Sequence, residues 1–363
     1  MDAYLCQLNY RKHFTSPIMI RIDNISLPSF PLLLAPMEDV SDPPFRAICK
    51  ENGADLVYTE FISSEGLIRN AIKCQRKLQI FNAERPVGIQ IFGGDEESLA
   101  MASAIVETTN PDLLDINFGC PVKNIAARGA GAGVLKDINL MVRLTKACVD
   151  STRLPVTVKT RLGWDDQSLN IEEVAERLQD VGIKALSIHG RTRCQMYKGQ
   201  ADWSLIAKVK NNPRIHIPIF GNGDIDSPQK ALDYKDRYGV DGIMIGRAAI
   251  GHPWIFREIK HYALTGEMPA PPDITERLMI CRMHLLKSIE WKGTLKGIFN
   301  MRGKYGAYLR GLPGIKEYLK KLMLLSESDP IMELFDEIGE NYAGYEIAQL
   351  PIELKNYHEN CPV

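Results

Sequence analysis

The 363-residue sequence lacks the features that would make it a membrane-spanning or exported protein. No apolar run approaches the roughly 20 residues that a membrane-spanning helix needs. The first residues, MDAYLCQLNYRKHF, show no charged start followed by an apolar run and a small-residue cleavage site. With 45% hydrophobic and 25% charged residues, the composition is that of an ordinary globular protein. We therefore expect a cytoplasmic protein with no membrane partner.

Clustered cysteines are also absent. The nearest two of the eight cysteines, Cys49 and Cys74, are 25 positions apart. This spacing excludes a CxxC motif and the zinc or iron–sulfur sites built on it, so no metal is expected. Most of these cysteines should be free thiols, several of them buried as small apolar residues.

The chain as a whole has almost no net charge, but its charges are distributed unevenly along the sequence. The formal net charge is −1, which argues at first against a nucleic-acid partner. Between Cys281 and Lys321, however, ten Lys or Arg stand against two Glu, a local excess of +8. This asymmetry indicates a basic patch on an acidic body, although a solvated helix face would give the same run of charge.

Short apolar runs alternate with longer helical patterns through the first two thirds of the chain. Each run is nearly continuous in hydrophobicity, as parallel strands covered on both faces require. Eight such runs before residue 250 predict a (β/α)8 TIM barrel, with an open doubly wound sheet as the alternative. The predicted strands are Leu32–Leu34, Leu56–Thr59, Val87–Ile91, Leu113–Ile116, Val156–Lys159, Ala185–Ile188, Ile217–Phe220 and Gly242–Ile245.

The pattern changes after Pro253. Three prolines at 269, 271 and 272 mark a linker, and helical periodicity dominates from Ile274 to about Phe335. A small all-helical C-terminal domain is therefore expected. The predicted divisions are an N-terminal extension (1–28) covering the barrel floor, the barrel (29–256), the helical domain (257–340) and a tail (341–363).

Polar or glycine-flanked groups follow seven of the eight predicted strands. Catalytic residues of such barrels lie at the carboxyl ends of the strands. The groups are Ala35-Pro36-Met37, Gln90, Asn117-Phe118-Gly119-Cys120-Pro121, Lys159-Thr160-Arg161, His189-Gly190-Arg191, Asn222-Gly223-Asp224 and Gly246-Arg247.

The last two groups favour a phosphate site, because loops after strands 7 and 8 form the usual phosphate site of a barrel. Ordinary turns would also use Gly, Asn and Asp. Lys159 ends a strand buried on both sides, so its ammonium needs an anion, either an electron-rich cofactor ring or a structural ion pair. His189 can serve as a hydrogen-bonding group or as a packing residue.

Cys120 lies in a Gly-Cys-Pro turn at the start of the longest loop between a strand and a helix. That loop, Val122–Leu135, contains three glycines with Lys123 and Arg128, and long glycine-rich loops are usually functional or mobile. A free thiol has a pKa of about 8.5, so it is mostly protonated at neutral pH and can donate a proton. A nucleophilic role would need a nearby base or a lowered pKa.

Taken in order from about residue 31 to 256, these motifs resemble the tRNA-dihydrouridine synthases, most of all the bacterial B-type branch. The combination of Asn117-Phe118-Gly119-Cys120-Pro121 with Lys159-Thr160-Arg161 and His189-Gly190-Arg191 is specific to that family. The sequence departs from the family at Glu38-Asp39, where a small residue usually follows the Pro-Met pair. It departs again at Val122-Lys123-Asn124.

The resemblance implies FMN in the barrel mouth, reduced by NADPH, and a role for each motif. Cys120 is then the proton donor. The implied flavin-binding residues are Pro36, Met37, Glu38, Gln90, Lys159 and His189, and the implied phosphate-binding residues are Asn222, Gly223, Asp224, Gly246 and Arg247. The predicted substrate-binding residues are Asn117, Lys123, Arg161 and Arg191.

The resemblance also makes tRNA the partner of the helical domain, with the protein expected as a monomer. A target uridine stacked in folded RNA must be turned out to reach a barrel mouth, while basic side chains hold the RNA phosphates. The predicted phosphate contacts are Lys292, Lys296, Arg302, Lys304, Arg310 and Lys316, with Tyr305 and Tyr308 as stacking candidates. Three alternatives remain: an FMN reductase of a free pyrimidine, a non-catalytic RNA-binding barrel, and a phosphate-binding isomerase or aldolase without flavin.

Overall fold

The computed structural model describes residues 19–347. The predicted extension (1–28) is therefore described only from residue 19, and the predicted tail (341–363) only as far as residue 347. Cys6 and Cys361 lie outside the described residues.

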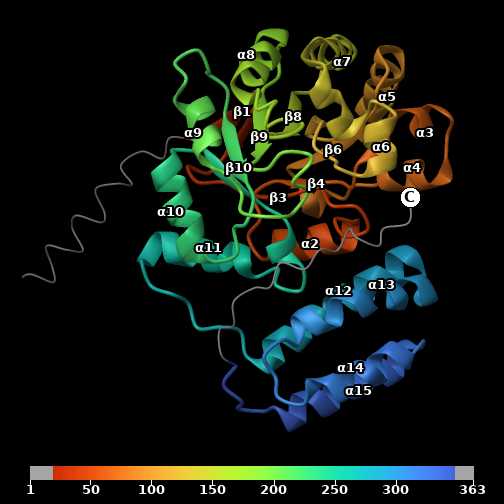
Figure 1. The fold of residues 1–363 in the computed structure, drawn as a ribbon. Coiled ribbons are helices and arrows are strands. Elements are labelled where there is room, and N and C mark those ends of the chain that lie inside the picture. Colours follow the sequence, from red (N-terminus) through yellow and green to blue (C-terminus); the bar gives the residue numbers. More distant parts are fainter. Residues whose placement is uncertain (1–18, 348–363) are drawn as a thin grey trace, which may run out of the picture.

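Eight parallel strands form a barrel, which confirms the predicted fold (Figure 1). The two ends of the sheet meet where Leu33 bridges Leu56 and the N–H of Leu34 donates to the carbonyl of Leu56 at 2.9 Å. A short strand, β5 (Ile62–Ser63), adds to β6. In spatial order the strands are β3 (Leu32–Leu34), β11 (Gly242–Ile245), β10 (Ile219–Asn222), β9 (Ala185–His189), β8 (Val156–Arg161), β7 (Leu113–Asn117), β6 (Val87–Phe92) and β4 (Val57–Tyr58).

Helices follow the strands and cover the barrel. Their starts are capped where the sequence supplies a short acceptor: Asp42 accepts from the Phe45 N–H at 3.1 Å, and Asp95 from the Ser98 N–H at 2.8 Å. The insertion between β4 and β6, which holds α3 and α4, was not predicted. The helices are α2 (Pro43–Glu51), α3 (Ser64–Ile68), α4 (Ile72–Lys77), α5 (Glu96–Thr108), α6 (Lys123–Ala127), α7 (Ile138–Asp150), α8 (Ile171–Val181), α9 (Ser204–Asn211), α10 (Pro228–Tyr238) and α11 (Ile255–Thr265), with 3-10 turns η2 (Asn82–Glu84), η3 (Gly131–Lys136) and η4 (Arg247–Ala249).

A hairpin packs against one end of the barrel interior. It consists of β1 (Ile20–Ile22) and β2 (Ile25–Leu27), paired antiparallel. Its buried Ile22 and Leu27 share a hydrophobic cluster with interior side chains such as Tyr58 and Phe220. The cluster includes Leu113 and Ala185, the first residues of β7 and β9, so the hairpin lies at the amino ends of the strands and leaves the carboxyl ends open.

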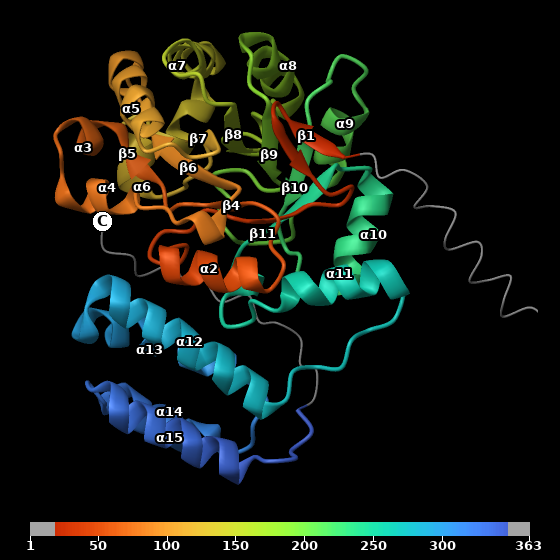
Figure 2. The same ribbon diagram turned by 180° about the vertical axis from the view of Figure 1, so that it is seen from behind.

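Four helices after the barrel form a second core beside it (Figure 2). They are α12 (Ile274–Lys292), α13 (Thr294–Tyr308), α14 (Ile315–Leu324) and α15 (Ser328–Asn341). Helix α12 lies against α2, and Ile48 and Trp254 of the barrel region join the helical core. The predicted helical C-terminal region is thus confirmed. In residues 19–347 no helix is both long enough and apolar enough to cross a membrane.

Candidate active site

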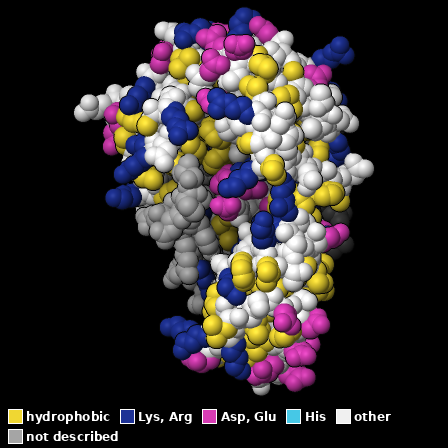
Figure 3. All heavy atoms as spheres, turned by 90° about the vertical axis from the view of Figure 1, so that its right-hand side faces the viewer, with side chains coloured by type: hydrophobic (Ala, Val, Ile, Leu, Met, Phe, Trp, Pro, Cys, Tyr) yellow, Lys and Arg dark blue, Asp and Glu magenta, His cyan; other side chains and the backbone are white. Residues whose placement is uncertain are grey.

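A cavity of about 1140 Å³ opens at the carboxyl ends of the strands. This exceeds the roughly 300–1,000 Å³ of a typical small-ligand pocket, so two flat ligands can lie in it together. Figure 3 views the side of the molecule on which α3 and α4 lie and shows a recess with hydrophobic lining, with Lys and Arg side chains around it. The wall takes one or more residues from the end of every barrel strand, among them Met37, Phe61, Phe92, Asn117, Lys159, His189, Asn222 and Gly246.

The turn that carries Cys120 is held from both sides. The side-chain oxygen of Asn117 accepts hydrogen bonds from the N–H groups of Gly119 (2.9 Å) and Cys120 (2.8 Å). On the other side, Arg161 donates to the carbonyl of Gly119 at 2.7 Å, and Ala132 donates to that of Cys120 at 3.0 Å. Cys120 is 6% exposed and lies on the cavity wall, so its thiol has a fixed position facing the cavity.

A buried hydrogen-bond chain fixes the orientation of Asn117. Its amide donates to the side-chain oxygen of Gln90 at 2.8 Å, and the Gln90 amide donates to Asp115 at 2.6 Å. The Thr157 hydroxyl donates to the second oxygen of Asp115. Gln90 is fully buried and lies behind the wall. Gln90 thus supports Asn117, and its predicted bond to a flavin stays a prediction.

The environment of Cys120 keeps its thiol protonated. Burial raises the pKa of Cys120 to about 11, and the backbone hydrogen bond from Val122 and the nearby charges of Arg161 and Lys159 offset this only in part. At neutral pH the group is therefore a thiol with a proton to give, and the arrangement favours an acid over a nucleophile.

Lys159 and His189 form a polar side of the cavity. Among residues 19–347 the Lys159 ammonium has no hydrogen-bond acceptor and no ion-pair partner, and burial together with the charge of Arg161 lowers its pKa to about 8. Burial and four surrounding cations hold the pKa of His189 well below its usual value, so its ring is neutral. A cation without a partner beside a neutral imidazole is suited to an anionic or electron-rich ring.

The loops after β10 and β11 form the predicted phosphate end of the cavity. Gly246 and Arg247 line the wall, and a Cβ added at Gly246 would lie in van der Waals contact with Ala35 and Met37, at 3.5 and 3.6 Å. The Asp224 carboxylate, however, accepts from Arg191 at 2.8 and 2.7 Å and from Arg247 at 3.3 Å. The Asp224 carboxylate is therefore engaged by arginines. The groups at this end of the cavity that could bind an anion are backbone N–H groups and the Arg247 side chain. Asn222 donates to the carbonyl of Met244 at 2.8 Å, while Gly223 has φ +126°.

Two predicted substrate residues, Arg191 and Arg161, make several hydrogen bonds within the protein. Arg191 is 2% exposed, lies off the wall, and donates to Asp224 and to the carbonyls of Lys198 and Gly199. It ties the loop after β9 to the loop after β10, and its predicted substrate contact stays a prediction. Arg161 lines the cavity, but three of its hydrogen bonds go to the carbonyls of Gly119, Thr192 and Met196.

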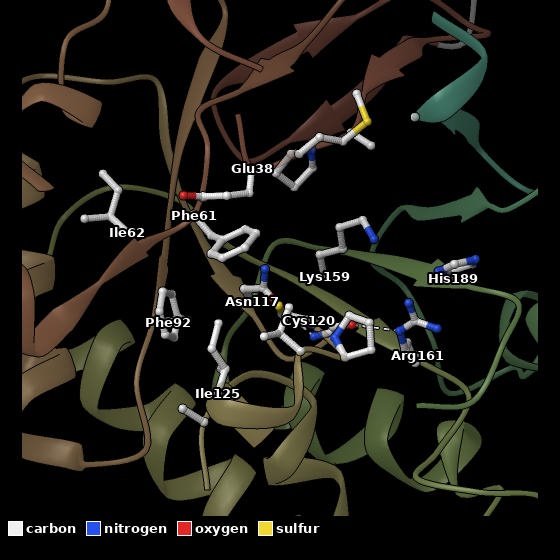
Figure 4. Close-up of a pocket in the computed structure, with 18 of the residues that line it drawn as sticks. Glu38, Phe61, Ile62, Phe92, Asn117, Cys120, Ile125, Lys159, Arg161 and His189 are labelled. Atoms are coloured by element: carbon white, nitrogen blue, oxygen red, sulfur yellow. Dashed lines mark hydrogen bonds between the residues drawn. The ribbon is translucent and has the colours of Figure 1, made fainter. Parts of the chain in front are cut away.

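The opposite side of the cavity is apolar and was not predicted. Phe61 and Phe92 meet edge to face with ring centroids 5.5 Å apart, and Ile62 and Ile125 lie beside them (Figure 4). Figure 4 shows Asn117 and Cys120 between this side and the side of Lys159 and His189. Both phenylalanines lie next to strand ends, which is the only signal that the sequence carries for them.

Glu38 lies on the wall near the rim. Its carboxylate pairs with Lys77, which also lies 3.8 Å from Glu60, and the Asp39 N–H donates to Glu60 at 2.8 Å. Burial raises the pKa of Glu38, and it raises that of Glu60 to about 7. Pro36 and Met37 line the wall beside Glu38, and Lys123 is exposed on the opposite rim.

The six predicted RNA contacts divide into two groups. Lys296 and Lys316 are exposed, and Arg302 and Arg310 are half-buried, with Arg302 donating to the carbonyl of Leu325 at 3.0 Å. Lys292 pairs with Asp42 of the barrel at 2.6 Å, and Lys304 is 4% exposed and donates to the carbonyl of Asn300 at 2.9 Å. Both lysines are therefore engaged within the protein, and their predicted contacts with RNA phosphates stay predictions.

The two candidate stacking residues of the helical region are corrected. Tyr305 and Tyr308 are each 0% exposed. Tyr308 bonds His284 at 2.9 Å, and Tyr305 packs edge to face on Phe335. Both belong to the helical core, because positions 305 and 308 are three residues apart and therefore lie on the same, buried face of α13.

The fold and the site together define a (β/α)8-barrel enzyme whose cavity carries cationic side chains and a protonated thiol. The family model for dihydrouridine synthase (Dus) matches residues 33–338, and the chain belongs to this family. The expected resemblance, including its B-type likeness, is thereby confirmed.

Relatives cover nearly the whole chain. The tRNA-dihydrouridine synthase B of Pseudomonas aeruginosa is 39% identical over 331 residues, which is 90% of this chain and 98% of the relative. A probable tRNA-dihydrouridine synthase of Rickettsia conorii is 36% identical over 320 residues, covering 88% and 96%. Among solved structures, a morphinone reductase variant in complex with tetrahydroNAD has a TM-score of 0.52 at 11% identity, covering 68% of this chain and 90% of that one. At that identity the likeness concerns the fold alone.

Proposed function

We propose that this protein reduces uridine to 5,6-dihydrouridine in tRNA, using FMN that is reduced by NADPH, with Cys120 as the proton donor. The observation that carries the proposal is the Cys120 thiol, fixed by Asn117 and Arg161 on the wall of a cavity with room for two flat rings. Membership of the dihydrouridine synthase family supports the same reaction.

The residues of the cavity fit FMN. The unpartnered ammonium of Lys159 and the neutral ring of His189 would hydrogen-bond the flavin ring, with Pro36, Met37 and Glu38 beside it. The backbone of Gly246 and the side chain of Arg247, with Asn222 and Gly223, line the same end of the cavity and would hold the phosphate. When bound and reduced, FMN supplies the hydride that C6 of uracil needs, which no amino-acid side chain can donate.

The protein's own residues supply the proton and the geometry. Cys120 gives its proton to C5 of the base as a general acid, and its raised pKa keeps that proton available at neutral pH. Asn117 and Arg161 hold the turn, so the thiol does not have to be ordered when the substrate arrives. Phe61 and Phe92 give the base an apolar wall and help to exclude water from the thiol.

The helical region would bind the body of the tRNA. The exposed Lys296 of α13 and Lys316 of α14 are its best placed phosphate contacts, with Arg302 on α13 and Arg310 in the connection between these two helices. The target uridine would have to be turned out of its loop to enter the cavity. Because one chain carries both the cavity and the basic helices, we propose a monomer that works in the cytoplasm.

The test uses purified full-length protein and an unmodified tRNA transcript. We expect a yellow protein with stoichiometric FMN, and NADPH-dependent formation of dihydrouridine measured by mass spectrometry of tRNA nucleosides. Free uridine and uridine monophosphate serve as competing substrates. Faster reduction of the free nucleoside than of tRNA would indicate a free-pyrimidine reductase, and a colourless protein would overturn the proposal.

A further inference from the structure

An ion pair joins the end of α12 to the barrel. Lys292 is the last residue of α12, and its ammonium lies 2.6 Å from the carboxylate of Asp42, which caps α2. The Asp42 side chain is 1% exposed and that of Lys292 is 14% exposed, so the pair is shielded from solvent. Although burial acts to raise it, the charges of Lys292 and Lys304 hold the pKa of Asp42 below its usual value. Removing Lys292 would leave the buried carboxylate of Asp42 with only the more weakly acting charge of Lys304 to compensate it.

The preceding residue, Trp291, makes a second attachment. Its indole N–H donates to the side chain of Gln79 at 2.7 Å. The guanidinium of Arg76 lies 4.6 Å from the centre of the indole ring and donates to the carbonyl of Trp291. Arg76 belongs to α4 and Gln79 follows it, so Trp291 and Lys292 reach two different segments of the barrel.

Both segments continue directly into the cavity wall. Asp42 follows Ser41, whose hydroxyl accepts from the N–H of Met37 at 2.7 Å and donates to its carbonyl at 2.9 Å. Met37 is part of the wall. In the second segment, Lys73, Cys74 and Lys77 of α4 line the cavity.

Arg46 braces the two segments against each other. It donates to the carbonyl of Ser41 at 2.8 Å and to that of Gln79 at 2.9 Å, and it pairs with Glu84 at 2.9 Å. The Arg46 and Glu84 side chains are each 1% exposed. A displacement of either segment is therefore passed to the other.

From this chain of contacts we propose that Trp291 and Lys292 are positioning residues, through which the docked helical region sets the shape of the cavity wall at Met37 and α4. The inference rests on the proposed function, in which the helical region holds the tRNA. It adds that the same region supports the flavin pocket. Lys292 thus acts on the pocket through Asp42 rather than on a phosphate.

The helical region offers a matched control for this role. Lys287 also lies on α12 and pairs with Glu51 of α2 at 3.4 Å, but both side chains are exposed, at 37% and 45%. Lys287→Met and Lys292→Met therefore make the same chemical change in the same helix and each break a pair with α2 or its cap. Only Lys292 is joined to a segment that lines the cavity.

The experiment compares these variants in the full-length holoprotein. We expect Lys292→Met to shift the visible absorbance of the bound flavin, to raise the Kd for FMN and to lower kcat by about tenfold or more, because small displacements in a site have effects of this size. The Kd for tRNA and its salt dependence should not change. Lys287→Met should leave all five quantities unchanged. Asp42→Asn should reproduce Lys292→Met, and the double variant should be no worse than either single one, because the two residues act as one unit.

Two results would overturn the inference. If Lys292→Met weakens tRNA binding and flattens its salt dependence while the flavin spectrum and FMN affinity are unchanged, Lys292 is a phosphate contact. If it lowers only the Tm, with kcat and FMN affinity as in Lys287→Met, the pair only stabilises the fold. The flavin spectrum and the Kd for FMN are measured without tRNA, so they decide this inference even if the wild-type protein forms no dihydrouridine.

Discussion

The side-chain oxygen of Asn117 accepts a hydrogen bond from the backbone N–H of Cys120 at 2.8 Å. The same oxygen also accepts from Gly119, and the Asn117 amide donates to the buried Gln90. The conformation of the turn that carries the thiol is therefore set by the Asn117 side chain at the end of the preceding strand. Asn117 is itself held in place by its hydrogen bond to Gln90. The position of the acid is built into the barrel before any ligand binds.

Replacing Asn117 tests whether this arrangement matters for the reaction. Asn117→Ala leaves two backbone N–H groups of the turn and the Gln90 oxygen without their partner, which should cost about 1–3 kcal/mol of unfolding free energy. We expect dihydrouridine formation to fall by about 10²-fold because the thiol loses its fixed position, while FMN remains bound. Urea unfolding and single-turnover assays measure the two effects, and normal turnover in this variant would contradict the role of the turn.

The charge of Lys159 predicts how FMN binding depends on pH. Its pKa is lowered to about 8 in the protein without ligand, so the ammonium is charged below that pH and neutral above it. An anionic ligand prefers the charged form. The affinity of flavin-free protein for FMN should therefore be constant up to about pH 8 and then fall by at most about tenfold per pH unit. Fluorescence titrations from neutral to alkaline pH measure this, and Lys159→Met should bind weakly without the decline. An equal decline in that variant would assign the effect to another group.

Replacing Phe61 tests whether the apolar side of the cavity contributes to substrate binding. Contact between a base and an aromatic side chain contributes about 1–3 kcal/mol per base, so Phe61→Ala should raise KM for tRNA by roughly five- to a hundredfold. Reduction of bound FMN by NADPH should keep its rate, because Phe61 lies across the cavity from Lys159 and His189. Phe61→Tyr, which keeps the ring, is the control. Equal loss in both variants would mean that the ring is not what the substrate contacts.

Salt dependence separates exposed from buried lysines in the helical region. Lys296→Met and Lys316→Met should each weaken tRNA binding and reduce the slope of log K against log salt by about 1. Lys304→Met should leave the slope unchanged, since Lys304 is 4% exposed and bonded to Asn300. Filter binding at several salt concentrations measures the slopes. A reduced slope for Lys304→Met would show that this side chain turns outward when RNA binds.

The strands of the barrel could be predicted because each one is a short apolar run that is buried on both faces. Gly242–Ile245 and Leu32–Leu34 match β11 and β3 residue for residue. All eight strands run in the same direction, so their carboxyl ends meet at one end of the barrel. The positions of Cys120, Asn117 and Lys159 on the cavity wall could therefore be predicted from where the strands end.

The functions of individual charges were harder to predict, since they depend on partners far away in the sequence. Lys292 looks like a phosphate contact until Asp42 is found beside it, 250 positions earlier in the chain. Arg191 comes directly after the end of a strand, where ligand-binding residues of a barrel lie. In the structure, both of its terminal nitrogens donate hydrogen bonds to the Asp224 carboxylate. The apolar side at Phe61 and Phe92 was missed because an aromatic residue after a strand is usually part of the core, and here the insertion of α3 and α4 opens a cavity beside it.

The most direct test of the central claim is the dihydrouridine formed by Cys120→Ala. The pre-reduced variant is mixed with unmodified tRNA, and dihydrouridine is measured by mass spectrometry beside the wild-type protein. We expect the variant to bind FMN and tRNA and to accept electrons from NADPH as the wild type does, while dihydrouridine falls by about 10²–10⁴-fold, the contribution of a general acid. Dihydrouridine at the wild-type rate would show that the proton comes from another group.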